Sequence, residues 1–438
     1  MDLLRNIFKG DKVVWIIFLC LCLISVVEVF SASSTLIYTS GNHWAPITRH
    51  ASFLLGGALV VLLFHNIPYR WFQLFPRVLL PLSAFFLILL LLFDNLHLGG
   101  FLVIEKTNEA GRWVKFFGLP FQPSEFAKMG VIIATAYILS RGQTEEGASP
   151  KAFRQILKVA GVMCLLILPE NYSTGVLLFG VVYLMMIVGR IQTRKLLMLG
   201  GALATVILLF VGFLFITPND TLEQIPLGHR FTTVKARIAD FTSSEEVPPS
   251  KFDVDDNAQV GHARIAVATS SIIGKGPGNS VQRDFLSQAY SDFIFAIIIE
   301  ELGLAGGGFV VFLYLWLLIR CWRIANRCER TFPAFLVLGI GLILTVQAMF
   351  NMMVAVGLAP VTGQPLPLIS RGGTSTLINC VYIGIILSVS RYNIEQQEKR
   401  KAEEEAAAAH TELPNALATV TGPAEPTAAS LNNDDEMA

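Results

Sequence analysis

Ten long apolar stretches dominate the 438-residue sequence and leave few folds open to it. A helix rises about 1.5 Å per residue and the hydrocarbon core of a bilayer is about 30 Å thick, so apolar runs of roughly 17 to 25 residues are expected to cross it. The stretches are residues 13–33, 47–64, 78–93, 126–140, 156–168, 174–188, 196–216, 293–319, 332–356 and 373–390. We therefore predict an all-α, polytopic integral membrane protein with about ten transmembrane helices.

The fifth and sixth stretches are short and leave two arrangements open. They could be two full spans, or a re-entrant hairpin around residues 169–173, because irregular backbone at membrane depth must be covered by protein or line a cavity. Both arrangements return the chain to the side that it left. The rest of the predicted topology is the same in either case.

The composition agrees with a lipid environment and argues against nucleic-acid binding. Charged residues make up 15% of the chain and hydrophobic residues 53%, whereas a soluble domain carries about 25% charged residues. The 33 basic residues balance the 33 acidic ones. No basic excess is present to displace counterions from a nucleic acid, so that partner is excluded.

The distribution of Lys and Arg predicts the orientation. Alternate connections hold 20 of the 33 basic residues, and the connections 34–44 and 357–370 hold none. Because basic residues are retained on the cytoplasmic side, we predict a cytoplasmic N-terminus at 1–12, a membrane domain at 13–391 with an extracytoplasmic loop at 217–291, and a cytoplasmic tail at 392–438. The tail is charged and then rich in Ala, Thr, Pro and Asn, which predicts disorder.

An acid and a base lie on one helical face where the fourth stretch begins. Glu125 and Lys128 are three residues apart, which predicts either an intrahelical ion pair or a site where Lys128 and Arg112 bind an anionic lipid headgroup. A second polar break, residues 169–175, contains Asn171. It either lines a cavity or forms a plain external turn.

Two further polar places follow in the second half of the chain. Asp292 begins the eighth stretch and either caps the helix or serves a function, while Glu300 and Glu301 lie deeper and need internal cations such as Lys128 or Arg49. Ser370 and Arg371 precede Gly372 and Gly373 at the start of the last stretch. This pattern predicts either an anion site at a helix N-terminus or a close-packed glycine pair.

The order of these motifs resembles the SEDS family (shape, elongation, division and sporulation) of bacterial cell-wall synthesis over roughly residues 13–391. The motifs are Ser31-Ala-Ser33, Gly111-Arg-Trp113, Gln122-Pro-Ser-Glu-Phe-Ala-Lys128, Gly276-Pro-Gly-Asn-Ser280, Ser291-Asp-Phe-Ile-Phe-Ala296, Glu300-Glu-Leu-Gly303 and Pro365-Leu-Pro-Leu-Ile-Ser370 with Gly372-Gly373. The glycine-rich motif, followed by Val281-Gln282, is more similar to the division branch of the family than to its elongation branch.

The resemblance implies a peptidoglycan glycosyltransferase that polymerises lipid II outside the cytoplasmic membrane, at the division septum. It places Asp292 at the position of the family's essential aspartate, where it would act as a base. Pyrophosphate or cavity contacts are then expected from Arg112, Lys128, Glu125, Arg283, Arg371, Asn171 and Ser370. The chain departs from the family at Asn171, an amide where the family commonly has an acid, and at Arg371, where a tyrosine usually precedes the glycine pair.

The resemblance also implies partners: a class B penicillin-binding protein as transpeptidase, and other membrane proteins of the division machinery. No cofactor is required by the sequence. A divalent cation, Mg²⁺ or Mn²⁺, could share the binding of pyrophosphate, but no ligand set is legible. Two other functions stay open, a lipid II flippase and a non-catalytic scaffold of the division machinery.

Overall fold

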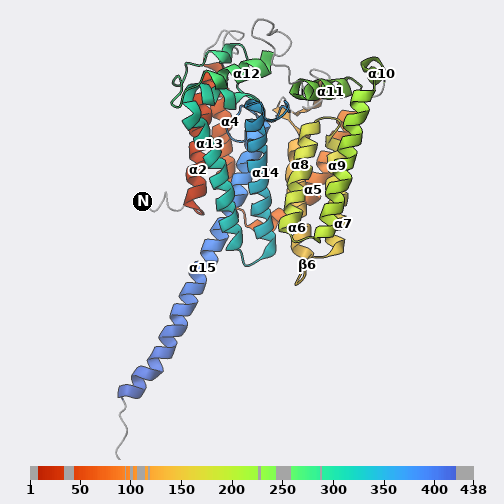
Figure 1. Ribbon diagram of the computed structural model, residues 1–438. Coiled ribbons are helices and arrows are strands. Elements are labelled where there is room, and N and C mark those ends of the chain that lie inside the picture. Colours follow the sequence, from red (N-terminus) through yellow and green to blue (C-terminus); the bar gives the residue numbers. More distant parts are fainter. Residues whose placement is uncertain are drawn as a thin grey trace, which may run out of the picture. The chain divides into compact units, whose positions relative to one another are not determined.

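The computed structural model describes residues 8–33, 44–93, 95–98, 102–105, 114–116, 119–224, 228–242, 258–286 and 289–420. The chain divides into two compact units, Met1–Arg391 and Tyr392–Ala438. The first unit is a helical bundle (Figure 1), and it contains every residue discussed as a site below.

Long helices form the bundle, and each of the ten predicted stretches overlaps one of them in the described part of the chain. They are α2 (Lys12–Ser31), α4 (Ala45–Phe64), α5 (Phe75–Leu92) preceded by the 3-10 turn η1 (Tyr69–Leu74), α6 (Pro123–Arg141), α7 (Pro150–Ile167), α8 (Tyr172–Val188), α9 (Thr193–Ile216), α13 (Ile294–Asn326), α14 (Thr331–Ala355) and α15 (Thr374–Val420). The predicted all-α, multi-pass membrane fold is confirmed.

The predicted count of ten spans is not confirmed by the length and composition of the described helices. Among the described residues, seven helical segments are long and apolar enough to cross a membrane, and α6, α7 and α8 are not among them. Charged residues enter α6 and α7, while α8 has 17 residues. At about 1.5 Å per residue α7 and α8 are each close to 26 Å long, which favours two helices that nearly span over a re-entrant hairpin.

Segments predicted as loops contain short elements. A four-stranded antiparallel sheet follows α5 and comprises β1 (Asn95–Leu98), β2 (Leu102–Glu105), β3 (Val114–Phe116) and β4 (Leu119–Phe121), paired in that order. A two-stranded hairpin, β5 (Gln143–Thr144) with β6 (Gly147–Ala148), links α6 to α7. The loop 217–291 contains α10 (Asn219–Glu223), α11 (Gly228–Thr242), α12 (Ala258–Ala268) and the 3-10 turn η2 (Gln282–Asp284).

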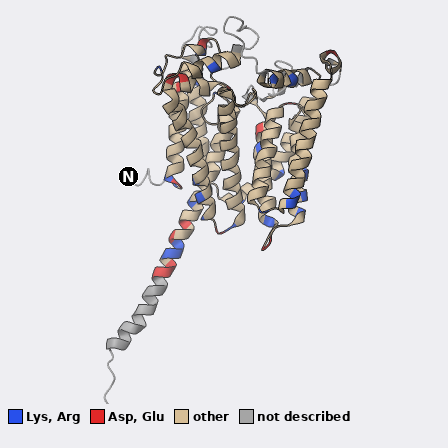
Figure 2. Ribbon diagram, in the orientation of Figure 1, with Lys and Arg blue, Asp and Glu red and all other residues tan. Residues whose placement is uncertain are grey.

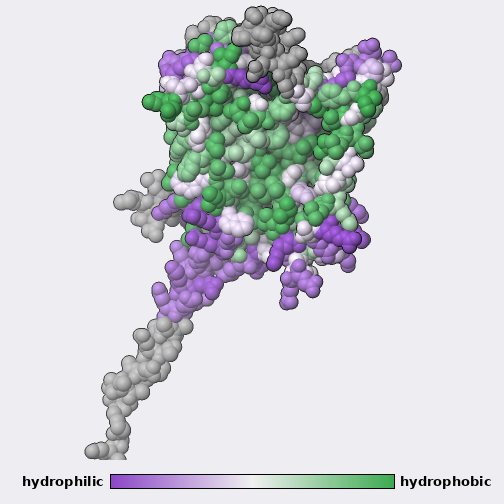
Figure 3. Space-filling view, in the orientation of Figure 1, coloured by the Kyte–Doolittle hydropathy of each residue, from purple (hydrophilic) through white to green (hydrophobic). Residues whose placement is uncertain are grey.

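The connections that we predict as cytoplasmic lie together at one end of the bundle. Arg320 at the end of α13 forms an ion pair with Asp11 before α2, with 2.7 Å between Nε and Oδ2. Arg391 donates to the Asn66 side chain, and Thr331 donates to the Ser140 carbonyl. Figure 2 shows Lys and Arg at this lower end, and Figure 3 shows an apolar belt between hydrophilic ends on the face in view.

Helix α14 occupies the centre of the bundle, where it contacts α6, α8, α12 and α13. Its polar residues Thr345, Gln347 and Asn351 are buried. Buried polar side chains need hydrogen-bond partners, since leaving one unpaired costs about 1–3 kcal/mol. Two of these residues, Gln347 and Asn351, form hydrogen bonds to the candidate site described below.

The predicted disorder of 392–438 differs from the structure over its first part, because α15 continues as a helix to Val420. The sequence after Gln396 is rich in Glu, Lys, Arg and Ala. These residues have high helix propensity, which outweighs the lack of apolar residues that suggested disorder. Residues 421–438 lie outside the described part.

Candidate functional site

A break within α13 lies beside the loop that precedes it. Gly303 adopts φ 74° and ψ −177° inside the helix, a conformation that is essentially restricted to glycine. The break frees backbone groups, which the loop takes up: Lys275 N and Gly276 N donate to the carbonyls of Glu300 and Glu301, and Leu304 N and Ala305 N donate to the carbonyls of Ser271 and Ile272. The loop therefore replaces the hydrogen bonds that the helix loses.

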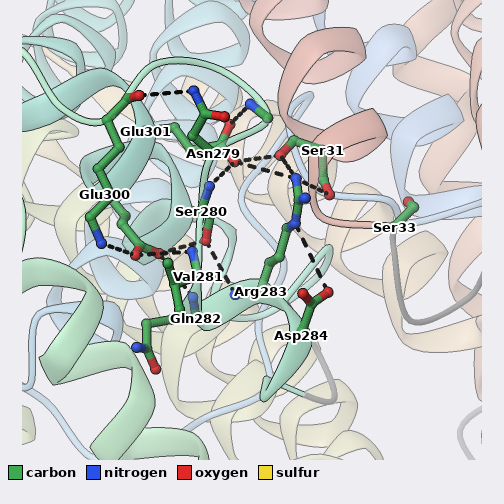
Figure 4. A network of polar contacts seen from close by, with 12 residues as sticks. Ser31, Ser33, Asn279, Ser280, Val281, Gln282, Arg283, Asp284, Glu300 and Glu301 are labelled. Atoms are coloured by element: carbon green, nitrogen blue, oxygen red, sulfur yellow. Dashed lines mark hydrogen bonds and ion pairs between the residues drawn. The ribbon is translucent and has the colours of Figure 1, made fainter.

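The two acids before this break are fully buried and are held by the same loop (Figure 4). The Glu300 carboxylate pairs with Lys275 Nζ at 2.6 Å and accepts from the Ser280 hydroxyl and from the amides of Val281 and Gln282. Multiple donors of this kind satisfy a buried carboxylate.

Glu301 is held in the same way from the other side of the loop. It accepts from the amides of Gly278 and Ser280, at 2.9 and 3.1 Å, and from the Ser31 hydroxyl. Arg283 Nη1 lies 3.9 Å from Glu301 Oε1 and donates to Ser31 Oγ at 2.9 Å. Arg283 therefore ties the loop to the end of α2.

These contacts correct two expectations. The cations of Glu300 and Glu301 are Lys275 and Arg283, not Lys128 or Arg49, because the glycine-rich loop folds back onto α13. Arg49 is exposed and forms no ion pair with a described acid. Arg283 is predicted as a pyrophosphate contact. Among the described residues, its guanidinium contacts Glu301 and Ser31 of this acid cluster.

Asp292 lies just before α13 but does not cap it. The N-cap residue is Phe293 and makes no side-chain cap hydrogen bond, so the capping reading of Asp292 is wrong. Its Oδ1 accepts from Ser291 Oγ at 3.1 Å, and its side chain is partly exposed. The carboxylate therefore lies at the start of α13 without capping that helix.

The backbone around Asp292 is fixed by the segment that leads into α15. Ser370 Oγ donates to the Ser291 carbonyl at 2.6 Å, and Arg371 N donates to the Tyr290 carbonyl at 3.0 Å. The Arg371 guanidinium lies over the Tyr290 ring, 5.4 Å from its centre. The structure thus brings the predicted residues Asp292, Ser370 and Arg371 together.

Opposing influences act on the pKa of Arg371. Burial lowers the pKa of its guanidinium, Tyr290 raises it and Arg49 lowers it. An arginine remains charged under such shifts. Arg371 and Arg49 thus add positive potential to the segment that packs against Tyr290, which suits an anionic ligand.

Asn351 connects Asp292 to the opposite side of the bundle. Its Nδ2 donates to the carbonyls of Asp292 and Gln364, at 2.9 and 2.7 Å. Gln364 in turn donates to Thr174 Oγ1 at 2.8 Å, and Asn171 caps α8 by accepting from Thr174 N. Asn171 thus has the role of a helix cap, and this chain of hydrogen bonds connects it to the Asp292 backbone.

The predicted Glu125–Lys128 ion pair is present and buried, with 2.7 Å between Lys128 Nζ and Glu125 Oε1. Lys128 Nζ also donates to Gln347 Oε1 at 3.0 Å, and Gln347 Nε2 donates to the Pro365 carbonyl. The pair therefore supports the same segment, residues 365–371, that holds Asp292. Arg112 lies outside the described residues.

Sequence reasoning missed Arg237 on α11. Its Nη1 donates to the Val361 carbonyl at 3.0 Å. Burial lowers the pKa of the Arg237 guanidinium, and the neighbouring Asp292 carboxylate raises it. A single cation in a mixed loop has no sequence pattern that distinguishes it. Glu170, which precedes Asn171 in the sequence, is also buried and was not singled out.

The arrangement combines one accessible carboxylate with several cations and buried hydroxyl and amide groups. Such a site can accept a proton from a hydroxyl and can stabilise a departing anion. Among the described residues, no three His, Cys, Asp or Glu side chains lie close enough to hold a metal ion. The described residues do not offer the acidic ligand set that Mg²⁺ or Mn²⁺ would take from protein alone.

The sequence is similar to a known protein family over most of its length. Residues 11–395 match the FtsW/RodA/SpoVE family model, described as cell cycle protein. The sequence is similar to a probable peptidoglycan glycosyltransferase FtsW of Halomonas elongata, with 32% identity covering 89% of this chain and 91% of that protein. It is also similar to the protein of the same description in Bacillus subtilis, with 29% identity covering 87% and 91%.

Two solved structures have a similar fold. One comes from work described as "Structural coordination of polymerization and crosslinking by a peptidoglycan synthase complex", with a TM-score of 0.65 and 22% identity over 88% of this chain and 99% of that one. The other is the rod shape determining protein RodA of Thermus thermophilus, with a TM-score of 0.59 and 21% identity over 88% and 98%.

Proposed function

The chain belongs to the FtsW/RodA/SpoVE family of cell cycle proteins, and on that premise we propose that it is a peptidoglycan glycosyltransferase that polymerises lipid II during septal wall synthesis. Its relatives in Halomonas elongata and Bacillus subtilis carry the name of that activity. The observation that supports it most is Asp292, a partly exposed carboxylate that does not cap α13 and that interacts electrostatically with Arg237.

Asp292 is the general base of the proposed reaction. It takes the proton from the 4-hydroxyl of the acceptor disaccharide as the hydroxyl oxygen bonds to C1 of the donor sugar. The bond between C1 and the undecaprenyl pyrophosphate breaks, and the pyrophosphate leaves with the electron pair. Arg371 N donates to the carbonyl of Tyr290, two residues before Asp292, and the Arg371 guanidinium offsets the charge that develops on the leaving group.

Ser370 and Asn351 position Asp292 rather than touch the substrate. Ser370 donates to the Ser291 carbonyl and Asn351 donates to the Asp292 carbonyl. These bonds fix the backbone from which the Asp292 side chain extends. Lys128 and Glu125 act one step further away through Gln347. No step is assigned to a divalent cation, because the described residues supply no ligand set for one.

The orientation and the partner belong to the same proposal. We place both termini in the cytoplasm and the Asp292 end outside, because 20 of the 33 basic residues fall in the alternate connections that we predict as cytoplasmic. A class B penicillin-binding protein would then meet this end and crosslink the new strands. The similarity to a structure of a peptidoglycan synthase complex that coordinates polymerisation and crosslinking supports that partner.

Substitution of Asp292 tests the proposal. Asp292→Asn keeps the size of the side chain but removes the proton acceptor, so we expect normal membrane insertion and a loss of at least about 100-fold in glycan synthesis from labelled lipid II, as for removal of a general base. The control is Asp220→Asn on the exposed helix α10, which should polymerise at the parental rate. Near-parental synthesis by Asp292→Asn would remove Asp292 from the chemistry.

A further inference from the structure

A chain of buried hydrogen bonds joins α4 and α2 to the segment that leads into α15. His50 Nε2 of α4 lies 2.8 Å from Ser25 Oγ of α2, and Ser25 Oγ donates to the Ile369 carbonyl at 2.7 Å. Ser25 and Ile369 are fully buried, and His50 is 2% exposed. Three elements that are distant in the sequence therefore meet at one serine hydroxyl.

The single proton of this hydroxyl fixes the direction of both hydrogen bonds. A carbonyl oxygen can only accept, so the Ser25 proton is used on Ile369. The bond between Ser25 and His50 is then donated by the imidazole from Nε2. A neutral imidazole carries one ring proton, so the proton of a neutral His50 lies on Nε2 and the lone pair on Nδ1.

The backbone held by this chain leads directly to the candidate base. Ser370 follows Ile369, and its hydroxyl donates to the Ser291 carbonyl at 2.6 Å. The amide of Arg371 donates to the carbonyl one residue before Ser291. Asp292 is the next residue after Ser291. A shift of the Ile369 carbonyl is therefore transmitted through two hydrogen bonds to the backbone beside the carboxylate.

We propose that His50 is a positioning residue for Asp292. Its Nε2–H holds the Ser25 hydroxyl on the Ile369 carbonyl, and the segment 366–371 fixed in this way holds the backbone from which the Asp292 carboxylate reaches the acceptor hydroxyl. This inference rests on the proposed function, in which Asp292 is the base. Neither His50 nor Ser25 belongs to the motifs that carry the family resemblance.

Two amide substitutions of His50 test which ring nitrogen matters. The amide nitrogen of Gln comes close to the position of Nε2, whereas that of Asn comes close to the position of Nδ1. His50→Asn should lower the kcat of lipid II polymerisation by roughly 10- to 100-fold and change the KM by less than about twofold. His50→Gln restores the donor to Ser25 and should keep at least about half of the parental kcat. Equal kcat values for the two variants would overturn the proposal.

The serine in the chain gives an independent test. Ser25→Ala removes the shared hydroxyl, so kcat should fall about as far as in His50→Asn, and the double variant should fall no further because both changes act through one group. Losses that multiply in the double variant would contradict a single chain. Ser52→Ala on α4 is the matched control, since the exposed Ser52 hydroxyl donates within its own helix. It should keep the parental kcat.

Hydrogen–deuterium exchange separates failure of this inference from failure of the proposed function. The amides of Leu366, Ile369, Ser370 and Arg371 are all hydrogen-bonded. Mass spectrometry of the purified full-length protein follows a peptide covering 366–371 without any turnover. Its exchange should be roughly fivefold faster in His50→Asn and parental in His50→Gln. Equal exchange in the two variants contradicts the role of His50, whereas the expected difference in a protein that never polymerises lipid II contradicts only the proposed function.

Discussion

At the scale of single residues, the Glu125–Lys128 pair shows how a buried charge can support a site without belonging to it. Both side chains are almost fully buried, and Lys128 also binds Gln347. Removing one partner of a buried pair leaves an uncompensated charge, which typically costs about 3–5 kcal/mol, whereas replacing both partners is often close to neutral.

Lys128→Met should therefore lower the free energy of unfolding by about 3 kcal/mol. The double variant Glu125→Gln with Lys128→Met should recover most of that loss, measured as the melting temperature in detergent. If Lys128 only supports the segment 365–371, polymerisation should recover with stability. A double variant that is stable but inactive would place Lys128 at the substrate, and a Lys128→Met protein with parental stability would contradict the structural pair.

The residues of the site were predictable to the extent that they carried a pattern. Asp292, Ser370 and Arg371 were nominated because polar residues stand out at the starts of apolar stretches. The structure brings the segments that carry them together. The partners of Glu300 and Glu301 were predicted wrongly. Those partners come from a glycine-rich loop about 20 residues earlier, and helical spacing says nothing about how such a loop folds back.

At the scale of elements, the break in α13 is the feature on which the acid cluster depends. Gly303 has a positive φ, and a Cβ there would lie 2.3 Å from the Ile272 carbonyl oxygen. Backbone strain of this kind costs about 1–3 kcal/mol before any steric displacement. The loop and helix would have to separate to make room.

Gly303→Ala should therefore lower the free energy of unfolding by about 2 kcal/mol or more and detach the loop from Glu300 and Glu301. Gly308→Ala, in the same helix, is the matched control, because no atom lies within 4 Å of its added Cβ. It should be neutral or slightly stabilising, since Ala is the better helix former. Equal melting temperatures for the two variants would show that the break is not held as described.

The helices were largely predictable, and the remaining elements were not. Apolar length alone located the ten stretches, because lipid requires it. The break at Gly303 was missed because the apolar pattern of α13 continues across it. The short strands β1 to β4 were missed because strands of three or four residues carry almost no alternation.

At the scale of the whole molecule, the two ends of the bundle differ in charge and in contacts. The predicted cytoplasmic connections meet through Asp11, Arg320, Asn66 and Arg391, and the candidate site lies at the other end. The boundary between the two compact units falls at Arg391, where the apolar sequence gives way to a charged one. Charge and apolar length are the features from which the sequence predicts a boundary after residue 391, because the bilayer constrains both.

Cysteine labelling in intact cells tests the orientation. Ile273, which is 83% exposed in the loop beside α13, and Asn326 at the end of α13 should differ when each is replaced by Cys in a background without the native cysteines. A membrane-impermeant reagent should label Ile273→Cys and not Asn326→Cys until the cells are opened. The reverse pattern would place Asp292 in the cytoplasm and exclude an external active site.

The most direct test of the central claim is whether the purified full-length protein converts labelled lipid II into long glycan strands, with and without a class B penicillin-binding protein, alongside Asp292→Asn. The account predicts strands from the parental protein and almost none from Asp292→Asn. A parental protein that moves lipid II across vesicle membranes but forms no strands under either condition would contradict it and would favour a transporter.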